Sequence, residues 1–374
     1  MTPGGKGRRK KKRTRKCRRK RSKRQKRRGQ QIPVKILFNN IRGLNSKLES
    51  LESILDDCDP DVVCISETNV HGTKKIKMKN YVSFTKNNPN KKSMGGLVTS
   101  VKEDVKLSAV KVNDNSEGDE FLIVRLEHVE PPLNIINIYG QQEGKDGQVG
   151  KDRVLESWGN LKKELCLIEL RGEAVLICGD WNRAIGADEH GVRGNKERIS
   201  DGGRLVRELV KEGEYFILNN LEMAAGGPWT RKDPADGSLS CLDLALGSAN
   251  LQPYIRGFQV DSKREFTPKR IVYKNGKMAD IYTDHYSCEV ELVMPASSEE
   301  TKTESRWNVL KPGGWERYRD VSDDYADKME EIIKDRRLNN EEVMEKIDKI
   351  QDKIKYIAFG KTKLKTNKNK TNQN

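Results

Sequence analysis

Short apolar runs, each closed by polar or turn-forming residues, recur along most of this chain. Runs of this length and spacing are typical of β-strands, because a strand needs only roughly four to eight residues and a helix needs more. The predicted strands are Val34–Phe38, Asp61–Ser66, Gly96–Val101, Phe121–Leu126, Leu133–Tyr139, Ala174–Gly179, Tyr215–Asn219, Leu239–Leu246 and Tyr286–Met294.

Helical periodicity is limited to a few segments. Apolar residues recur on one stripe across Leu48–Leu55, and Ser46 followed by Glu49 has the spacing of a capping box at the start of this helix. Two further helices are expected near 151–169 and 203–213.

The order of these elements is not a strict alternation of strand and helix. Gly96–Leu126 contains strand-like runs with no helix between them, which indicates consecutive hairpins. A doubly wound parallel sheet requires a crossover helix between neighbouring strands. The sequence therefore predicts an α/β fold with two packed, mostly antiparallel sheets.

The net charge of +16 comes from one segment. Residues 1–30 contain 18 Lys and Arg and no acid, whereas the rest of the chain has 54 basic and 56 acidic residues. Lys6–Arg28 has almost no apolar side chain to offset chain entropy, so we expect a disordered basic arm. Such blocks bind nucleic acid or act as nuclear and nucleolar address signals. A merely solubilising tail is the alternative, although so many like charges exceed what solubility needs.

Composition divides the chain into three parts. We expect the arm at 1–30, a folded domain at 31–295 and a charged helical linker and tail at 296–374. In the last part, 316–357 has a thin apolar stripe typical of exposed helices, and 361–374 is rich in Lys, Asn and Thr and is expected to be disordered.

Two segments within the folded domain look like inserted loops. Gly186–Gly203 is rich in glycine and charge, and residues 261–283 carry a series of Lys and Arg residues.

Cysteine usage favours a reducing compartment, and hydropathy argues against a membrane span. The seven cysteines are scattered and contain no C-x-x-C pair, which argues against a zinc site and against a disulfide framework. Four of them lie inside apolar runs, where a thiol behaves as a small hydrophobe: Cys64, Cys178, Cys241 and Cys288. No apolar run reaches the length of a membrane span, and the basic N-terminus is not a secretory signal.

Six short motifs place a carboxylate, amide, phenol or imidazole at or near apolar runs. They are Asn39–Leu44, Ser66–Thr68, Asn137–Tyr139, Gly179–Asn182, Ser240–Asp243 and Thr283–His285. Together they supply acidic ligands for a hard cation, an acid to orient a water, and an Asp to hold a His. These are the groups that metal-assisted phosphodiester hydrolysis requires.

The order of these motifs resembles the endonuclease/exonuclease/phosphatase superfamily over roughly residues 33 to 293. The sequence is most similar to the endonuclease domain of non-LTR retrotransposons in three motifs, Gly179–Arg183, Gly227–Arg231 and Ser240–Leu244. In addition, Arg306–Leu310 looks like the linker that precedes their reverse transcriptase. The resemblance implies a deoxyribonuclease I-like four-layer α/β sandwich, two mostly antiparallel sheets flanked by helices. It also implies an Mg²⁺-dependent DNA endonuclease whose nick leaves a 3′-hydroxyl for target-primed reverse transcription.

The resemblance assigns three residues to the metal. Glu67 ends the apolar run Val62–Ile65 and would be the main ligand, and Asp284 would face the metal side. The Asn40 amide would touch the metal or hold Glu67, and a simple turn Asn is the alternative. Mg²⁺ suits carboxylate and amide oxygens, with Mn²⁺ as an alternative cation.

The catalytic residues follow the same resemblance. Asp180 would activate the attacking water, and Asn182, on the same side of an extended segment by its i, i+2 spacing, would hold a phosphate oxygen. Tyr139 would donate to the phosphate; a strand-end Tyr that only packs is the alternative. Asp243 sits inside an apolar strand, where a charge needs a partner, and His285 would be that partner.

Four residues are expected to contact nucleic acid: Arg42, Trp229, Thr230 and Arg231. Arg42 stands where many relatives have Asp or Asn, so it would bind phosphate or weaken a second metal site. Thr283 replaces the usual Ser and keeps the hydroxyl. Trp229 would stack on or wedge into the substrate, and a Trp that anchors the turn is the equal alternative.

The leading hypothesis is therefore a nuclear or nucleolar DNA endonuclease of retrotransposon origin, with element RNA as a further partner of the arm. No reverse transcriptase module is visible after residue 310, so we expect a fragment, a truncated copy or a co-opted nuclease. One alternative keeps the fold and changes the substrate to an abasic site, RNA or phospholipid. The other is a nucleic-acid-binding protein whose nuclease fold is catalytically dead.

Overall fold

The computed structural model describes most of the predicted folded domain. The described residues are 31–72, 74–87, 95–103, 109–112, 120–140, 147–187, 191–192, 199–211, 215–274 and 277–297, with eight single positions between 325 and 350. The predicted arm at 1–30, part of the Gly186–Gly203 loop and nearly all of 298–374 lie outside them. By compactness the chain divides into Met1–Ser298 and Glu299–Asn374.

The first sheet has seven strands. In spatial order they are β10 (Ala224–Ala225), β14 (Ile255–Val260), β17 (Cys288–Pro295), β1 (Gln31–Asn40), β2 (Val62–Ser66), β4 (Leu97–Lys102) and β3 (Tyr81–Lys86). Most neighbours are antiparallel, but β10 runs parallel to β14 and β1 runs parallel to β2, with Asn40 beside Ser66 at the shared end of β1 and β2. Their carboxyl ends therefore meet at one edge of the sheet.

The second sheet has six strands. Their order is β5 (Ala109–Lys111), β6 (Phe121–Leu126), β7 (Leu133–Tyr139), β8 (Ala174–Asp180), β13 (Asp243–Ser248) and β9 (Tyr215–Ile217). Here β7 and β8 are the parallel pair, and Tyr139 lies beside Asp180. The antiparallel strand β13 begins at Asp243, which also pairs with Asp180.

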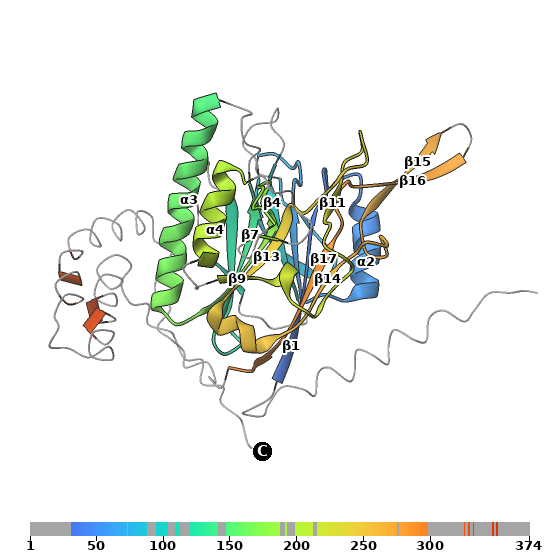
Figure 1. Cartoon of the computed structure of the whole chain (residues 1–374). Coiled ribbons are helices and arrows are strands. Elements are labelled where there is room, and N and C mark those ends of the chain that lie inside the picture. The colour runs from blue at the N-terminus through green and yellow to red at the C-terminus, as the bar shows by residue number, and fades with distance from the viewer. Residues whose placement is uncertain are drawn as a thin grey trace, which may run out of the picture. The chain divides into compact units, whose positions relative to one another are not determined.

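Helices cover the outer faces of the two sheets (Figure 1). On one side α2 (Leu48–Cys58) buries Leu51 against the seven-stranded sheet. On the other side α3 (Gly147–Leu170) and α4 (Asp201–Lys211) pack on the six-stranded sheet. Side chains of both sheets, such as Phe38 and Leu176, share the core between them. The predicted four-layer sandwich is confirmed.

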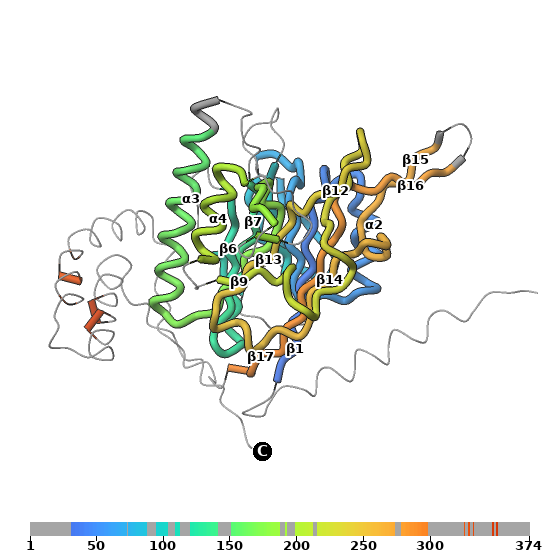
Figure 2. The backbone as a smooth tube through the Cα atoms, in the orientation of Figure 1, coloured from blue at the N-terminus to red at the C-terminus, as the bar shows by residue number. Residues whose placement is uncertain are grey.

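Two short hairpins stand outside these sheets. One pairs β11 (Arg231–Lys232) with β12 (Leu239–Ser240), and the other pairs β15 (Lys269–Lys274) with β16 (Lys277–Tyr282). The second projects from the body of the domain, as the backbone tube in Figure 2 shows. The prediction of a plain loop at 261–283 is therefore wrong. The described residues of this hairpin bury no apolar face, so its sequence lacks the run of apolar residues by which most strands are predicted.

Three other local predictions need correction. Lys47 is the N-cap of α2 and no side chain of the described residues caps it, so the Ser46–Glu49 capping box is not formed. The predicted strand Leu239–Leu246 is broken between β12 and β13. The run Tyr215–Asn219 turns into a short 3₁₀ helix, η1 (Leu218–Asn220). A second 3₁₀ helix, η2 (Ala249–Tyr254), joins β13 to β14.

The four cysteines predicted to be core residues, Cys64, Cys178, Cys241 and Cys288, are buried and free. No helix of the described residues is long and apolar enough to cross a membrane.

Candidate active site

The parallel pairs β1–β2 and β7–β8 bring the predicted acids and amides to one edge of the sandwich. In the first sheet, Asn40 ends β1 and Glu67 follows β2 directly. In the second sheet, Tyr139 and Asp180 end β7 and β8. Contacts between these residues cross from one sheet to the other, because Asn40 donates to Asp180 and Tyr139 donates to Glu67. The edge is therefore a single site shared by both sheets.

The backbone at this edge is unusual. Arg42, Glu67 and Asn182 adopt positive φ angles of 45°, 50° and 48°. Left-handed backbone is unfavourable for residues other than glycine, and it tends to cluster at functional sites. Gly179 has a φ of 137°, and a Cβ there would lie 2.2 Å from the carbonyl oxygen of Ile138. Only glycine fits at this position, one residue before Asp180.

Asp180 is deeply buried, with 1% of its surface exposed, the same fraction as for Asp243. Its Oδ2 accepts hydrogen bonds from Asn40 Nδ2 at 2.8 Å and Asn182 Nδ2 at 3.1 Å, and its Oδ1 accepts the Asn182 backbone N–H at 2.9 Å. Burial raises the pKa of Asp180 to about 7, and the charge of Asp243 adds to this, although nearby His285 acts in the opposite direction. A carboxyl group with this pKa exchanges protons at neutral pH.

The predicted extended geometry between Asp180 and Asn182 is wrong. The left-handed Asn182 folds back, so that Asp180 caps its backbone N–H in a tight turn. The Asn182 amide still reaches the site, where Nδ2 also donates to the carbonyl oxygen of Gly140 at 2.8 Å. The turn holds both side chains at the same end of β8.

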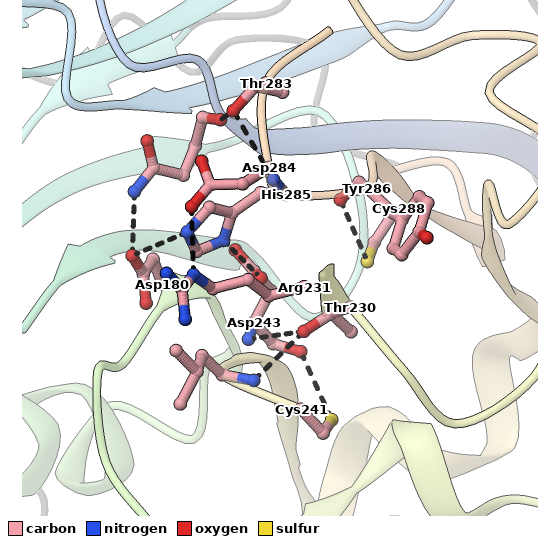
Figure 3. A network of polar contacts seen from close by, with 12 residues as sticks. Asp180, Thr230, Arg231, Cys241, Asp243, Thr283, Asp284, His285, Tyr286 and Cys288 are labelled. Atoms are coloured by element: carbon pink, nitrogen blue, oxygen red, sulfur yellow. Dashed lines mark hydrogen bonds and ion pairs between the residues drawn. The ribbon is translucent and has the colours of Figure 1, made fainter. Parts of the chain in front are cut away.

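His285 lies between two carboxylates (Figure 3). Its Nδ1 is 2.8 Å from Asp243 Oδ2, and its Nε2 is 3.9 Å from Asp180 Oδ2. Burial lowers the pKa of His285, but the charges of Asp243 and Asp180 outweigh that effect and raise it to about 9. The ring is therefore an imidazolium at neutral pH, held by the partner that the sequence predicted.

Two buried residues hold Asp243 in place: Thr230, for which the sequence analysis predicted another role, and Asn219, which it missed. Thr230 Oγ1 accepts the backbone N–H groups of Leu242 and Asp243 at 3.0 and 2.9 Å. Asn219 Nδ2 donates to the carbonyl oxygen of Asp243 at 3.1 Å. Asn219 carried a usable signal, because it is a polar residue closing an apolar run, as Asp180 is. Thr230 is 0% exposed, which corrects its prediction as a nucleic-acid contact.

Glu67 and Tyr139 form the other half of the edge. The Tyr139 hydroxyl donates to Glu67 Oε1 at 2.7 Å. Burial, followed by the Glu67 charge, raises the pKa of Tyr139, so the phenol keeps its proton. Glu67 Oε2 is buried and has no hydrogen-bond partner among the described residues. A buried carboxylate oxygen without a donor is the group that a hard cation would satisfy.

Asn40 bonds to Asp180 and not to Glu67, so the alternative in which it holds Glu67 is not seen. Its Oδ1 accepts the backbone N–H of Arg42 at 3.1 Å, which closes the turn after β1. The Thr283 hydroxyl, which replaces the usual Ser, donates to the carbonyl oxygen of Asn40 at 2.9 Å. This contact ties the segment that carries His285 to the end of β1.

Asp284 is surrounded by cationic side chains. Arg42 lies 3.0 Å from its Oδ1, and Arg231 lies 3.0 Å from its Oδ2. Burial alone would raise the pKa of Asp284, but His285, Arg42 and Arg231 together lower it below its usual range. Its proposed role as a metal ligand stays a prediction, since both of its oxygens already face guanidinium groups.

The site has enough acidic groups for a divalent cation. Single ligand atoms of Asp180, Asp243 and His285 lie within 4.8 Å of one another. However, Asp243 Oδ2 already bonds to His285, and a protonated imidazole repels a cation, even though Asp243 Oδ1 is, like Glu67 Oε2, a buried oxygen without a hydrogen-bond partner among the described residues. We therefore favour the side of the site at Glu67, whose free oxygen fits a hard ion best.

Three predicted nucleic-acid contacts lie near the rim of this site. The side chain of Arg42 is 45% exposed and that of Arg231 is 24% exposed, and both reach toward Asp284. Trp229 is half-buried in the turn before β11. Its two predicted roles, stacking on the substrate or anchoring the turn, stay predictions.

Comparisons with known proteins agree with this geometry. The model of the Endonuclease/Exonuclease/phosphatase family matches residues 40–262. An AP endonuclease from Leishmania major is similar over 70% of this chain and 88% of its own, at 16% identity and a TM-score of 0.55. A 3′-5′ exonuclease from Neisseria meningitidis is similar over 69% of this chain and 99% of its own, at 17% identity and 0.51.

The endonuclease domain of TRAS1, a telomere-specific non-LTR retrotransposon, covers 70% of this chain and 98% of its own at 12% identity and a TM-score of 0.49. No curated protein sequence gives a significant match. At these identities, the structural matches establish the fold alone.

Proposed function

Because this chain belongs to the endonuclease/exonuclease/phosphatase family of ester-cleaving hydrolases, we propose that it is an Mg²⁺-dependent DNA endonuclease. It hydrolyses a phosphodiester bond with water and leaves a 3′-hydroxyl. The observation that carries this proposal is the geometry of Asp180, a buried acid held by the Asn40 and Asn182 amides 3.9 Å from the His285 ring, and burial also raises its pKa to about 7. A general base is most effective when its pKa lies near the working pH.

In the proposed reaction, Asp180 orients the attacking water and takes its proton. The Asn40 and Asn182 amides fix the carboxylate, so the lone pair that accepts the proton has one direction. The Asn182 amide and the Tyr139 hydroxyl are neutral groups that can donate to a phosphate oxygen once the substrate displaces a present acceptor, Asp180 or the Gly140 carbonyl for Asn182 and Glu67 for Tyr139. Both keep their protons at neutral pH, which suits hydrogen bonding to an anion.

The Asp243–His285 pair supplies positive charge. Asp243 fixes the ring through Nδ1, so Nε2–H points into the site beside Asp180. An imidazolium in this position stabilises the negative charge that builds on the phosphate oxygens in the transition state. Pairing the imidazolium with the Asp243 carboxyl group limits the cost of burying the positive charge.

Glu67 is the main residue for holding the cation, with Asn40 and Asp284 as further candidates. When bound, Mg²⁺ supplies Lewis acidity toward the phosphate and the leaving oxygen. Mn²⁺ suits the same oxygen ligands as an alternative ion. The hydrogen bond from Tyr139 leaves one Glu67 oxygen for this purpose.

DNA as the substrate and a retrotransposon origin are supported by sequence. The motifs at Gly179–Arg183 and Ser240–Leu244 resemble the corresponding motifs of non-LTR retrotransposon endonucleases, and residues 1–30 form a basic block. We assign to this block non-specific affinity for DNA or element RNA and a nuclear or nucleolar address. In this proposal the nick primes synthesis by a reverse transcriptase.

Nicking of supercoiled plasmid tests the proposal. Wild-type protein with Mg²⁺ should convert supercoiled DNA to open circles, and EDTA should abolish the reaction. Glu67→Ala and Asp180→Ala should each be inactive, whereas Asp57→Asn, an exposed acid on α2, should match the wild type. DNA binding without nicking by the wild type would favour the catalytically dead alternative. Preferred cleavage of an abasic duplex or of RNA would favour the altered-substrate alternatives.

A further inference from the structure

A positively charged groove begins where the active site ends. It has a volume of about 530 Å³, and Asp284 is one of its lining residues. The turn of the β11–β12 hairpin contributes one wall, and the base of the β15–β16 hairpin contributes another. Four cationic side chains line it together with Arg42, and we call them the groove cations: Lys47, Lys232, Arg264 and Arg270.

The acids of the groove do not neutralise these cations. Asp284 is paired with Arg42 and Arg231, and Asp233 is paired with Arg231 as well. Within the described residues, none of the groove cations forms an ion pair with a carboxylate. Excess positive charge next to a phosphodiesterase site is complementary to a nucleic-acid backbone.

The groove cations are held in place by contacts other than ion pairs. Arg264 stacks over the rings of Tyr282 and Tyr286 and donates to the carbonyl oxygen of Thr283 at 2.6 Å. Lys47 donates to the carbonyl oxygens of Ile41 and Arg42. Burial first, and then repulsion from Arg270 and Arg42, lowers the pKa of Lys47. Like charges that crowd one another in this way form a site suited to an anion.

The β15–β16 hairpin extends this surface away from the body (Figure 1). Each strand has six residues, so the hairpin is about 20 Å long. Residues opposite each other in the register share a face, and at the base of the hairpin Arg270 and Ile281 of one face and Tyr282 of the other line the groove. The other face carries Ile271, Tyr273 and Met278, which are 58%, 76% and 61% exposed. We call these three residues the ribbon face.

Exposed large apolar side chains gathered on one face usually mark a binding surface. A two-stranded ribbon fits into the major groove of duplex DNA, where apolar side chains contact base edges. A ribbon laid with the ribbon face toward the floor of that groove brings these apolar side chains to the base edges. The cationic base and the apolar ribbon face then match the backbone and the bases of the same duplex.

We propose that the β15–β16 hairpin is a DNA-binding ribbon that sets where this protein cuts. The groove cations hold the phosphates next to the scissile bond, and the ribbon face contacts bases farther along the duplex. This inference rests on the proposed function, because it assigns the substrate duplex a second contact outside the catalytic residues.

The experiment combines binding and cleavage by the full chain. Binding to a duplex of about 30 base pairs is measured by fluorescence anisotropy over a range of salt concentrations. Nick positions are mapped on end-labelled DNA. The variants are Arg270→Ala for the groove and Tyr273→Ser with Met278→Ser for the ribbon face. Arg256→Ala is the control, since this exposed Arg begins β14 at the end away from the site.

Arg270→Ala should lower the slope of log affinity against log salt by about 1, the effect of one lost phosphate contact. The ribbon-face variant should leave the salt slope unchanged but redistribute the nick positions and raise KM, with kcat within roughly twofold of wild type. Arg256→Ala should match the wild type in both measurements.

Two results would overturn the inference while leaving the proposed function intact. One is wild-type nicking with a salt slope for Arg270→Ala equal to that of Arg256→Ala. The other is an unchanged nick pattern in the ribbon-face variant, which would assign that face to a protein partner. Failure of the wild type to nick any duplex, in contrast, would refute the proposed function itself.

Discussion

Strand β8 has a buried acid at each end, and the two acids have opposite properties. Glu173, just before the strand, is 4% exposed and accepts from Arg125 at 2.8 and 3.1 Å and from Asn134 at 2.9 Å, with Arg171 at 3.1 Å. Burial would raise the pKa of Glu173, but Asn134 and the two arginines lower it below its usual range. This acid is ionised and fully paired.

Asp180, at the other end, is equally buried but lacks a guanidinium partner among the described residues. Its donors are amides, and its nearest cation is the His285 ring at 3.9 Å. Its pKa rises to about 7, mainly through burial. The difference teaches that burial alone does not identify a catalytic acid. The partner charge decides whether a buried carboxylate is a structural anchor or a proton acceptor.

The largest expected effect follows from replacing Asp180. Asp180→Asn removes the proton acceptor and also removes an acid that is costly to bury. Activity should fall at least about 10²-fold, the usual effect of losing a general base, while Tm stays equal or rises. Plasmid nicking rates and thermal unfolding measure the two effects. A variant that kept a tenth of the wild-type rate would remove Asp180 from the proposed mechanism.

A second large effect is expected for the Asp243–His285 pair. Asp243→Asn should preserve the fold, lower the pKa of His285 and reduce activity by roughly 10²-fold. His285→Ala should have a similar effect. The double variant should be little worse than either single variant, because the two residues act as a unit. Strictly additive losses in nicking rate would show that Asp243 has another role.

The same pair predicts how stability depends on pH. The folded-state pKa of His285 is raised from 6.5 to about 9, so the folded form holds the proton more tightly. This contribution is fully present below the ordinary pKa of 6.5 and is lost as pH rises through about 9. Asp243→Asn should remove this fall in the free energy of unfolding, which denaturant titrations at several pH values measure. If the free energies of unfolding of Asp243→Asn and wild type differed by the same amount below pH 6.5 and above about pH 9, the raised pKa of His285 would be contradicted.

The smallest effect on activity is expected at the opposite end of β8. Glu173→Gln should leave the nicking rate within about threefold of wild type, because Glu173 is far along the strand from the site, but should cost about 1–3 kcal/mol of stability. The pKa of Glu173 is lowered, so its contribution is present above its usual range and is lost as pH falls. The Tm difference between variant and wild type should therefore shrink in acid. A large loss of activity in Glu173→Gln would contradict the distinction between a structural acid at the start of β8 and a catalytic acid at its end.

The sequence predicts the strands because each buried run, such as Val62–Ser66, is apolar and bounded. It also predicts most of the site, since the polar residue that follows such a run must lie at a sheet edge. It cannot predict which residues at the edge touch. Asn40 bonds to Asp180 across 140 positions, and that pairing depends on how the two sheets pack.

The sequence analysis missed the contacts of Arg42 and Arg231 with Asp284 and also missed the β15–β16 hairpin, for different reasons. The contacts of Arg42 and Arg231 with Asp284 join three distant segments, so no local pattern reveals them. The β15–β16 hairpin buries no apolar face, although the Asn-Gly dipeptide at 275–276 between β-forming residues was a usable turn signal.

The closed pairing of β15 with β16 has a consequence for variation. Lys269 and Tyr282 face each other at the base of the hairpin, and His285 follows three residues later. The separation of these two base residues is fixed by their own cross-strand pairing, whatever the length of the hairpin beyond them. Adding or removing one residue on each strand keeps that base register, although it turns over the faces at the tip. The outer hairpin is thus free to diversify while the imidazole stays where it is.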